Sequence, residues 1–168
     1  MRYFMILVFL LVLPACGYHF PGQGGALPGG VEKLYIPLFI NKTSEAQLDN
    51  KLTSRVTEVF ARNHKLSQVE TLDQADAILE GRIDKYQSRA LSYDKNDDIS
   101  EYRATMIVSA QLKSARSKEV LWQKTVTWSV DYTAANDKAI QADLEKQAID
   151  EISLRIAEEL FYQLLDDF

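Results

Sequence analysis

Apolar and polar residues alternate along two long stretches of this chain, 102–112 and 120–132. A period of two is typical of a strand with one buried face. A third such stretch, 78–93, changes phase after Ile83, which predicts a β-bulge. Polar turns at 94–98 and 114–118 join these three stretches. The pattern therefore predicts an antiparallel meander with one solvent-exposed face. The apolar stripes are Tyr102, Ala104, Met106, Val108, Ala110 and Leu112, followed by Val120, Trp122, Val126, Trp128, Val130 and Tyr132.

Two amphipathic helices are predicted on either side of this meander, at 45–63 and 137–165. Their apolar residues recur every three or four positions, which gives each helix a single apolar stripe. Ser44 and Gln47 suggest a capping box at the start of the first helix. Because the helices and the sheet each expose one apolar face, they can bury each other. The stripes comprise Leu48, Leu52, Val56, Val59 and Phe60, then Ile140, Leu144, Ala148, Ile149, Ile152, Ile156, Leu160, Phe161 and Leu164.

A further strand is expected at 31–40, with Leu34, Ile36, Leu38 and Ile40 on one face. Its Pro37 cannot donate to a ladder, which favours a sheet edge or a bulge. A short strand at 66–70 and a turn at 73–76 complete the pattern. The predicted fold class is therefore α+β: a two-layer sandwich, with two amphipathic helices packed on one face of a mostly antiparallel four-stranded sheet.

The first fifteen residues have the layout of a secretory signal peptide, with Arg2 followed by an apolar run over 3–13. An eleven-residue helix rises roughly 16 Å, about half of a hydrocarbon core, which is too short for a stable span. The sequence Leu-Pro-Ala-Cys at 13–16 resembles the lipobox of bacterial lipoproteins. That resemblance implies a diacylglycerol on the sulfur of Cys16, cleavage before it, acylation of the new amine, and outer-membrane sorting through Gly17.

The chain is thus expected to divide into a cleaved signal peptide (1–15), a lipidated cysteine with a linker rich in glycine and proline (16–30), and one α+β domain (31–168). Since Cys16 is the only cysteine, it excludes an intrachain disulfide framework and a cysteine-rich zinc site. The formal net charge of −5 argues against nucleic acid as a partner.

No catalytic pattern is found in the sequence. His19 and His64 have no plausible nucleophile beside them, and pairs of aspartates fall in the turns 73–76 and 94–98, where aspartate commonly binds its own backbone. HExxH, GxSxG and P-loop motifs do not occur. We therefore expect no enzyme, no catalytic residue, no metal site and no cofactor apart from the covalent lipid on Cys16.

A binding role has three candidate features, of which the aromatic stripe Trp122, Trp128 and Tyr132 is more often core than interface. The polar sheet face carries Arg103, Lys113, Thr125 and Thr127, although ordinary solvation of a surface also explains it. The basic turn that follows Lys113 and includes Arg116 suits phosphorylated headgroups, although surface turns commonly collect such residues.

Several motifs, taken in order, resemble the lipopolysaccharide-assembly lipoprotein family LptE. Cys-Gly-Tyr-His-Phe at 16–20 is similar to the family's mature start. The stretches 36–43 and 75–83 resemble its first strand and turn and the beginning of its meander, and 101–103 and 120–122 match later strands. The resemblance covers essentially all of residues 16–165.

This resemblance implies a lipid-anchored outer-membrane protein, facing the periplasm and the lumen of a large β-barrel, LptD. The family member plugs that barrel, assists its folding and helps insert lipopolysaccharide into the outer leaflet. The implied contacts with lipid A phosphates are Lys95, Arg103, Arg116 and Lys138, and the implied barrel-facing residues are Lys113, Thr125 and Thr127. Two other functions stay open: a periplasm-facing adaptor that scaffolds a different envelope machine, and a lipid-active enzyme.

Overall fold

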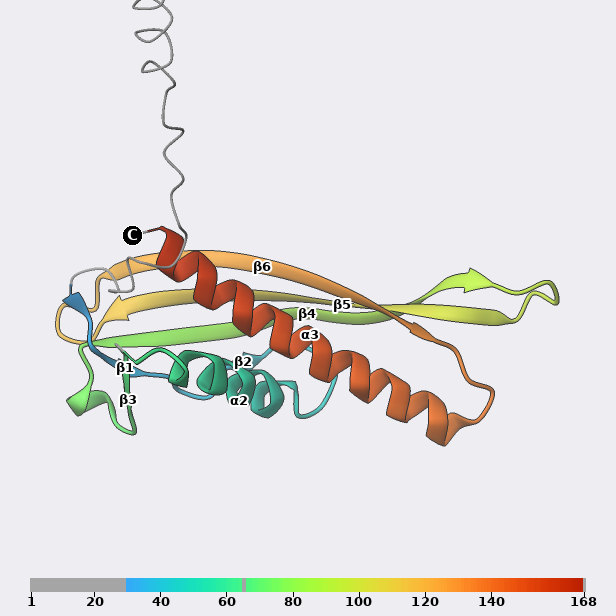
Figure 1. Ribbon diagram of the computed structural model, residues 1–168, viewed down its shortest axis with the longest axis horizontal. Coiled ribbons are helices and arrows are strands. Elements are labelled where there is room, and N and C mark those ends of the chain that lie inside the picture. Colours follow the sequence, from blue (N-terminus) through green and yellow to red (C-terminus); the bar gives the residue numbers. More distant parts are fainter. Residues whose placement is uncertain (1–29, 65, 168) are drawn as a thin grey trace, which may run out of the picture.

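The computed structural model describes residues 30–64 and 66–167 (Figure 1). The expected signal peptide, Cys16 and the linker up to residue 29 lie outside the described residues. The helices and strands are β1 (Lys33–Tyr35), β2 (Ile40–Asn41), α2 (Leu48–Ala61), β3 (Ser67–Val69), the 3₁₀ helix η2 (Leu72–Gln74), β4 (Ala77–Tyr93), β5 (Ile99–Ser114), β6 (Val120–Thr133) and α3 (Lys138–Asp166).

The predicted meander is confirmed: β4, β5 and β6 pair antiparallel along nearly their whole length. The predicted bulge is present as well. Ile83 lies opposite Val108 and Lys85 lies opposite Ile107, so Asp84 is the extra residue on β4. The bulge lets β4 change phase while its apolar residues stay on the buried side.

The prediction of four mostly antiparallel strands is wrong in detail, because the sheet is mixed and has six strands. Its order is β3-β1-β4-β5-β6, and β2 also pairs with β4. β1 is parallel to both β3 and β4, and β2 is parallel to β4. Parallel neighbours need a crossover connection, and α2 supplies it between β1 and β3.

The strand expected over 31–40 is divided into two short pieces. The break falls around Pro37, which has no N–H to donate to a ladder. Beyond it the alternation reverses: Phe39 is buried, whereas Leu38 and Ile40 are each 55% exposed. The prediction that Leu38 and Ile40 share the buried face is therefore wrong.

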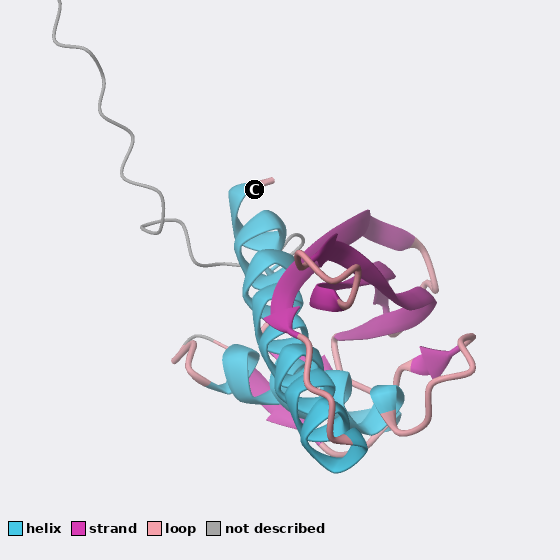
Figure 2. Ribbon diagram, turned by 90° about the vertical axis from the view of Figure 1, so that its right-hand side faces the viewer, coloured by secondary structure: helices cyan, strands magenta, loops and turns pink. Residues whose placement is uncertain are grey.

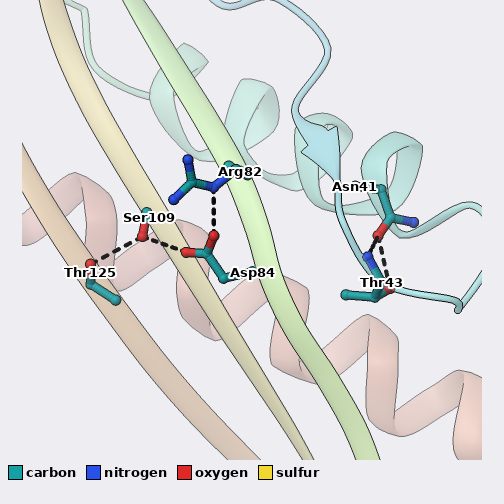
Figure 3. Close-up of polar contacts among 6 residues, drawn as sticks. All are labelled: Asn41, Thr43, Arg82, Asp84, Ser109 and Thr125. Carbon is teal, nitrogen blue, oxygen red and sulfur yellow. Dashed lines mark hydrogen bonds and ion pairs between the residues drawn. The ribbon is translucent and has the colours of Figure 1, made fainter.

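The start of α2 also differs from the expectation. Gln47 has a left-handed backbone (φ 63°) and no side-chain cap, so no capping box forms. A turn just upstream replaces it (Figure 3): Asn41 Oδ1 accepts hydrogen bonds from the backbone N–H of Thr43 at 2.9 Å and from its hydroxyl at 2.8 Å. By contrast α3 begins as predicted, since the Asp137 carboxylate accepts from the N–H groups of Ala139 and Ile140.

Figure 2 shows α3 running along one side of the curved sheet. Both helices contribute to one apolar cluster with the inner sheet face, through residues such as Leu52, Phe60, Ile152 and Leu160. The ring of Phe60 meets Phe161 edge-on at 5.1 Å between centroids, and this contact joins α2 to α3. α2 and α3 thus cover the apolar face, and no helix within residues 30–64 or 66–167 covers the opposite face of the sheet.

Coverage of the apolar stripe is incomplete on β6, the last strand of the sheet. Trp122 and Val126 are buried, but Trp128 is 36% exposed and Val120 is 47% exposed. These two residues were expected on a buried face. They lie on an edge strand, and no further strand of the described chain covers them.

Candidate functional site

The helix-free face of β4, β5 and β6 is the most distinctive surface of the described chain. Residues Arg103, Thr105, Ser109, Gln111 and Lys113 of β5 point to it. On β6, Thr125 lies opposite Ser109, and Thr127 lies opposite Ile107, which is on the same face of β5. We call this surface the polar face.

Hydrogen bonds run across the polar face from strand to strand (Figure 3). The Ser109 hydroxyl donates to Asp84 and lies 3.1 Å from the Thr125 hydroxyl. Asp84 in turn accepts from Arg82 at 2.5 Å. Side chains of β4, β5 and β6 therefore bind one another across this part of the polar face.

The bulge places Asp84 in this network. Partial burial alone would raise the pKa of Asp84, but the hydrogen bonds from Ser109 and Arg82 outweigh it and hold the pKa below its usual value. The carboxylate therefore stays charged at neutral pH, as an acceptor that ties β4 to β5.

A second cluster lies farther along the polar face, around Glu80. Its carboxylate accepts from Lys113 at 2.8 Å and from Gln111 at 2.9 Å. The hydrogen bond from Lys113 is the largest cause of the lowered pKa of Glu80. Lys113, expected to face a barrel wall, is thus paired within its own sheet.

A shallow hollow borders this cluster where Ile40 meets β4 and β5, next to Arg82 and Gln123. Gly81 is among the residues that line it. A Cβ at this position would lie 2.1 Å from the ring of Phe39, so only glycine allows that ring to pack beneath the sheet.

Arg103 lies on the polar face opposite Asp131, with Nε 2.6 Å from Oδ1 and a second guanidinium nitrogen 2.7 Å from Oδ2. This two-point pairing lowers the pKa of Asp131 and raises the pKa of Arg103. Arg103 is therefore a neutralised cation.

The other expected phosphate contacts are divided between the two ends of the sheet. Lys95 is exposed in the turn between β4 and β5, and Arg116 is exposed in the turn between β5 and β6. These turns are at opposite ends of β5, whose 16 residues span roughly 50 Å. Lys138 begins α3 shortly after β6 ends beside Glu101, so Lys95, Arg103 and Lys138 belong to the same end of the sheet and Arg116 to the other.

Two cations on the polar face were missed by the sequence reasoning, Lys85 and Arg89. Both are exposed, and no ion pair joins either of them to another residue within 30–64 or 66–167. Arg89 lies directly opposite Arg103. The phase change in the sequence predicts a bulge after Ile83. Shifting the alternation of β4 by one residue at that bulge would have placed Lys85 and Arg89 on the polar face.

Two turn aspartates bind backbone N–H groups: Asp94 binds its own turn, as expected, whereas Asp76 binds a segment distant in the sequence. Asp76 accepts from the N–H groups of Glu32 and Lys33, and Asp94 accepts from those of Asn96 and Asp98. His64 is exposed after the end of α2. Within the described ranges no three His, Cys, Asp or Glu side chains gather closely enough to hold a metal ion. No helix in those ranges has the length and apolar character needed to cross a membrane.

Several solved structures with a similar fold have the word lipoprotein in their names. Rare lipoprotein B from Shewanella oneidensis is 13% identical, with a TM-score of 0.55, covering 81% of this chain and 96% of its own. An uncharacterized lipoprotein B from Nitrosomonas europaea is 18% identical, with a TM-score of 0.55, covering 89% and 90%. A minor lipoprotein from Acinetobacter baumannii is 13% identical, with a TM-score of 0.51, covering 81% and 92%. At these identities the likeness concerns the fold.

Among curated proteins no sequence matches the chain significantly. A family model does: LptE, described as lipopolysaccharide-assembly, matches residues 31–164, from just before β1 nearly to the end of α3. That range contains β1 to β6, α2, all but the last two residues of α3, and the whole polar face. The chain therefore belongs to the LptE family of lipopolysaccharide-assembly proteins.

Proposed function

We propose that this protein is an outer-membrane lipoprotein that plugs a large LptD-like β-barrel, assists its assembly and helps it insert lipopolysaccharide into the outer leaflet. The family match over residues 31–164 carries the proposal. The protein acts as a binding and assembly partner, without a catalytic residue, a metal or a cofactor, and without nucleic acid. The lipid on Cys16 anchors it to the membrane.

The polar face supports a plug role on physical grounds. The interior wall of a wide barrel is polar and wet. A surface that enters it must not bring unpaired buried groups, since each such group costs free energy. On this face Thr105 pairs with Ser129, Ser109 with Thr125, and Lys113 with Glu80. Lys113, Thr125 and Thr127 are accordingly our candidates for contact with the barrel.

Lipopolysaccharide contact is proposed at Lys95, Arg103, Arg116 and Lys138. Because Arg116 lies at the opposite end of β5, one lipid A headgroup cannot meet all four. We therefore assign the headgroup to the end that carries Lys95, Arg103 and Lys138. Arg103 would have to exchange Asp131 for a phosphate, an exchange that its planar guanidinium suits geometrically.

The test is purification of the native protein in a gentle detergent, together with depletion of the protein in cells. We expect a β-barrel of several hundred residues to co-elute, and surface lipopolysaccharide to fall on depletion. Elution without a barrel and unchanged surface lipopolysaccharide would contradict the proposal. Co-elution with a different envelope assembly would instead support the adaptor function.

A further inference from the structure

β6 is the last strand of the sheet, and in the described part of the chain no strand lies beside its outer edge. All its strand pairing within the described residues is with β5. Figure 1 shows β6 along the border of the sheet, with α3 crossing only near its beginning and diverging from it farther on. The part of this 14-residue strand that α3 does not cross therefore presents backbone N–H and C=O groups that another strand could pair with.

The central part of this edge, residues 125–130, lacks the features that usually protect an edge strand. Its sequence, Thr-Val-Thr-Trp-Ser-Val, contains no charge and no proline. Its pairing with β5 is continuous and without a bulge. Four of the six residues are exposed, and Trp128 is among them although it lies on the helix side of the sheet. An uncharged, regular and exposed edge is the kind that accepts a further strand.

The charges that flank this segment are neutralised inside the protein. Lys124 forms an ion pair with Asp167 at 3.0 Å, and Asp131 forms one with Arg103 at 2.6 Å. Each ion pair therefore weakens the electrostatic repulsion that Lys124 or Asp131 alone would exert on an approaching strand.

We propose that β6 pairs antiparallel with β6 of a second copy of this chain, with Thr127 of one copy opposite Thr127 of the other. The two sheets then join into one continuous sheet through a two-fold interface. The inference concerns the protein on its own and does not rest on the proposed function.

The β6 sequence is complementary to itself in this register. On the polar face Thr125 lies opposite Ser129 of the second copy, and the hydroxyl pairs Ser109–Thr125 and Thr105–Ser129 thereby continue across the axis. On the other face Val126 lies opposite Trp128 and Trp122 lies opposite Tyr132, apolar and aromatic pairs that stabilise antiparallel sheets. Lys124 faces Val130 and Asp131 faces Gln123, so no like charges meet.

The first test is disulfide cross-linking of the full chain carrying Thr127→Cys. Directly opposed residues have Cα atoms about 4.5–5.5 Å apart, within reach of a disulfide. The matched control is Thr125→Cys, a residue of the same type on the same face, whose two copies would lie four residues apart, roughly 13 Å. Both variants retain Cys16, so a disulfide through that residue would affect them equally.

We expect Thr127→Cys to form a disulfide-linked dimer under mild oxidation, in several-fold greater yield than Thr125→Cys. Equal yields, or a greater yield from Thr125→Cys, would overturn the proposal.

The second test measures self-association of the purified chain by sedimentation velocity over a range of concentrations. Thr127→Lys places two cations opposite each other at the axis, so it should raise the dimer dissociation constant several-fold. The control variant is Ile107→Lys, which puts the same charge on β5, opposite Thr127 and away from the proposed interface. It should raise the dimer dissociation constant less. A wild-type chain that remains monomeric throughout, or equal effects of the two variants, would contradict the proposed pairing.

Discussion

At Gly81 the absence of a side chain allows the ring of Phe39 to pack beneath the sheet. A Cβ there would lie 2.1 Å from a ring carbon, and the ring itself is buried. We expect Gly81→Ala to lower the free energy of unfolding by about 1–3 kcal/mol, the usual cost of overpacking a core. Urea denaturation of the two proteins measures it.

The double variant Gly81→Ala with Phe39→Ala identifies the cause. Once the ring is removed, the added methyl group meets no obstacle, so Gly81→Ala should cost much less in the Phe39→Ala background. The same cost in both backgrounds would show that the strain arises elsewhere than at this contact.

A second prediction at the residue scale concerns Arg103 and its partner Asp131. If the guanidinium binds a lipid A phosphate, Asp131→Asn should strengthen binding of lipopolysaccharide several-fold, because it removes the competing carboxylate. Arg103→Gln should weaken binding. Displacement of a fluorescent lipid A probe measures both, and unchanged affinity in the two variants would exclude Arg103 as a contact.

Among the elements, α3 depends on its first turn for a defined start. Asp137 accepts hydrogen bonds from two backbone N–H groups of that turn, at 2.8 and 3.1 Å. We expect Asp137→Ala to lower the free energy of unfolding by about 0.5–2 kcal/mol, as for other N-cap residues. Glu151→Ala, at an exposed position in the middle of the helix, is the control and should change thermal unfolding very little.

Elements with a long and regular apolar pattern could be predicted from the sequence. The alternation of β5 and the stripe of α3 set their positions, and the phase change after Ile83 predicts the bulge of β4. The pattern failed where one residue changes the backbone direction. Pro37 divides the first strand, and Gln47 takes a left-handed conformation that no local motif indicates.

For the molecule as a whole, the order of the strands could not be read from periodicity. Parallel pairing of β1 with β3 and β4 depends on contacts between residues far apart in the sequence. The same holds for the polar face. Alternation placed Arg103 and Lys113 on it, but only the register shows that Asp131 and Glu80 neutralise them.

The paired carboxylates of the polar face predict how stability depends on pH. The pKa values of Glu80, Asp84 and Asp131 lie below their ordinary values of 4.5, 3.8 and 3.8. As the pH falls, the unfolded chain therefore binds protons before the folded one does, and stability is lost. We expect the free energy of unfolding to be at its full value above about pH 5. Below that pH it should fall progressively, first through the ordinary pKa values of the unfolded chain and then toward the lowered pKa values of the folded protein.

Urea midpoints measured between neutral and acidic pH check this prediction. We expect the urea midpoint to fall less steeply with pH in a triple variant, because its replaced side chains no longer take up protons. This variant carries Glu80→Gln, Asp84→Asn and Asp131→Asn. An equally steep fall in this variant would place the acid-sensitive groups elsewhere.

The most direct test of the plug proposal is photo-cross-linking from the centre of the polar face in intact membranes. Ile107 lies there, partly buried between Lys85 and Thr127 of the neighbouring strands, so a photoreactive phenylalanine should be tolerated at this position. We predict a light-dependent adduct whose second component is the outer-membrane β-barrel. An adduct with a different envelope protein would contradict the plug proposal. So would the absence of any adduct when the labelled protein is present and folded.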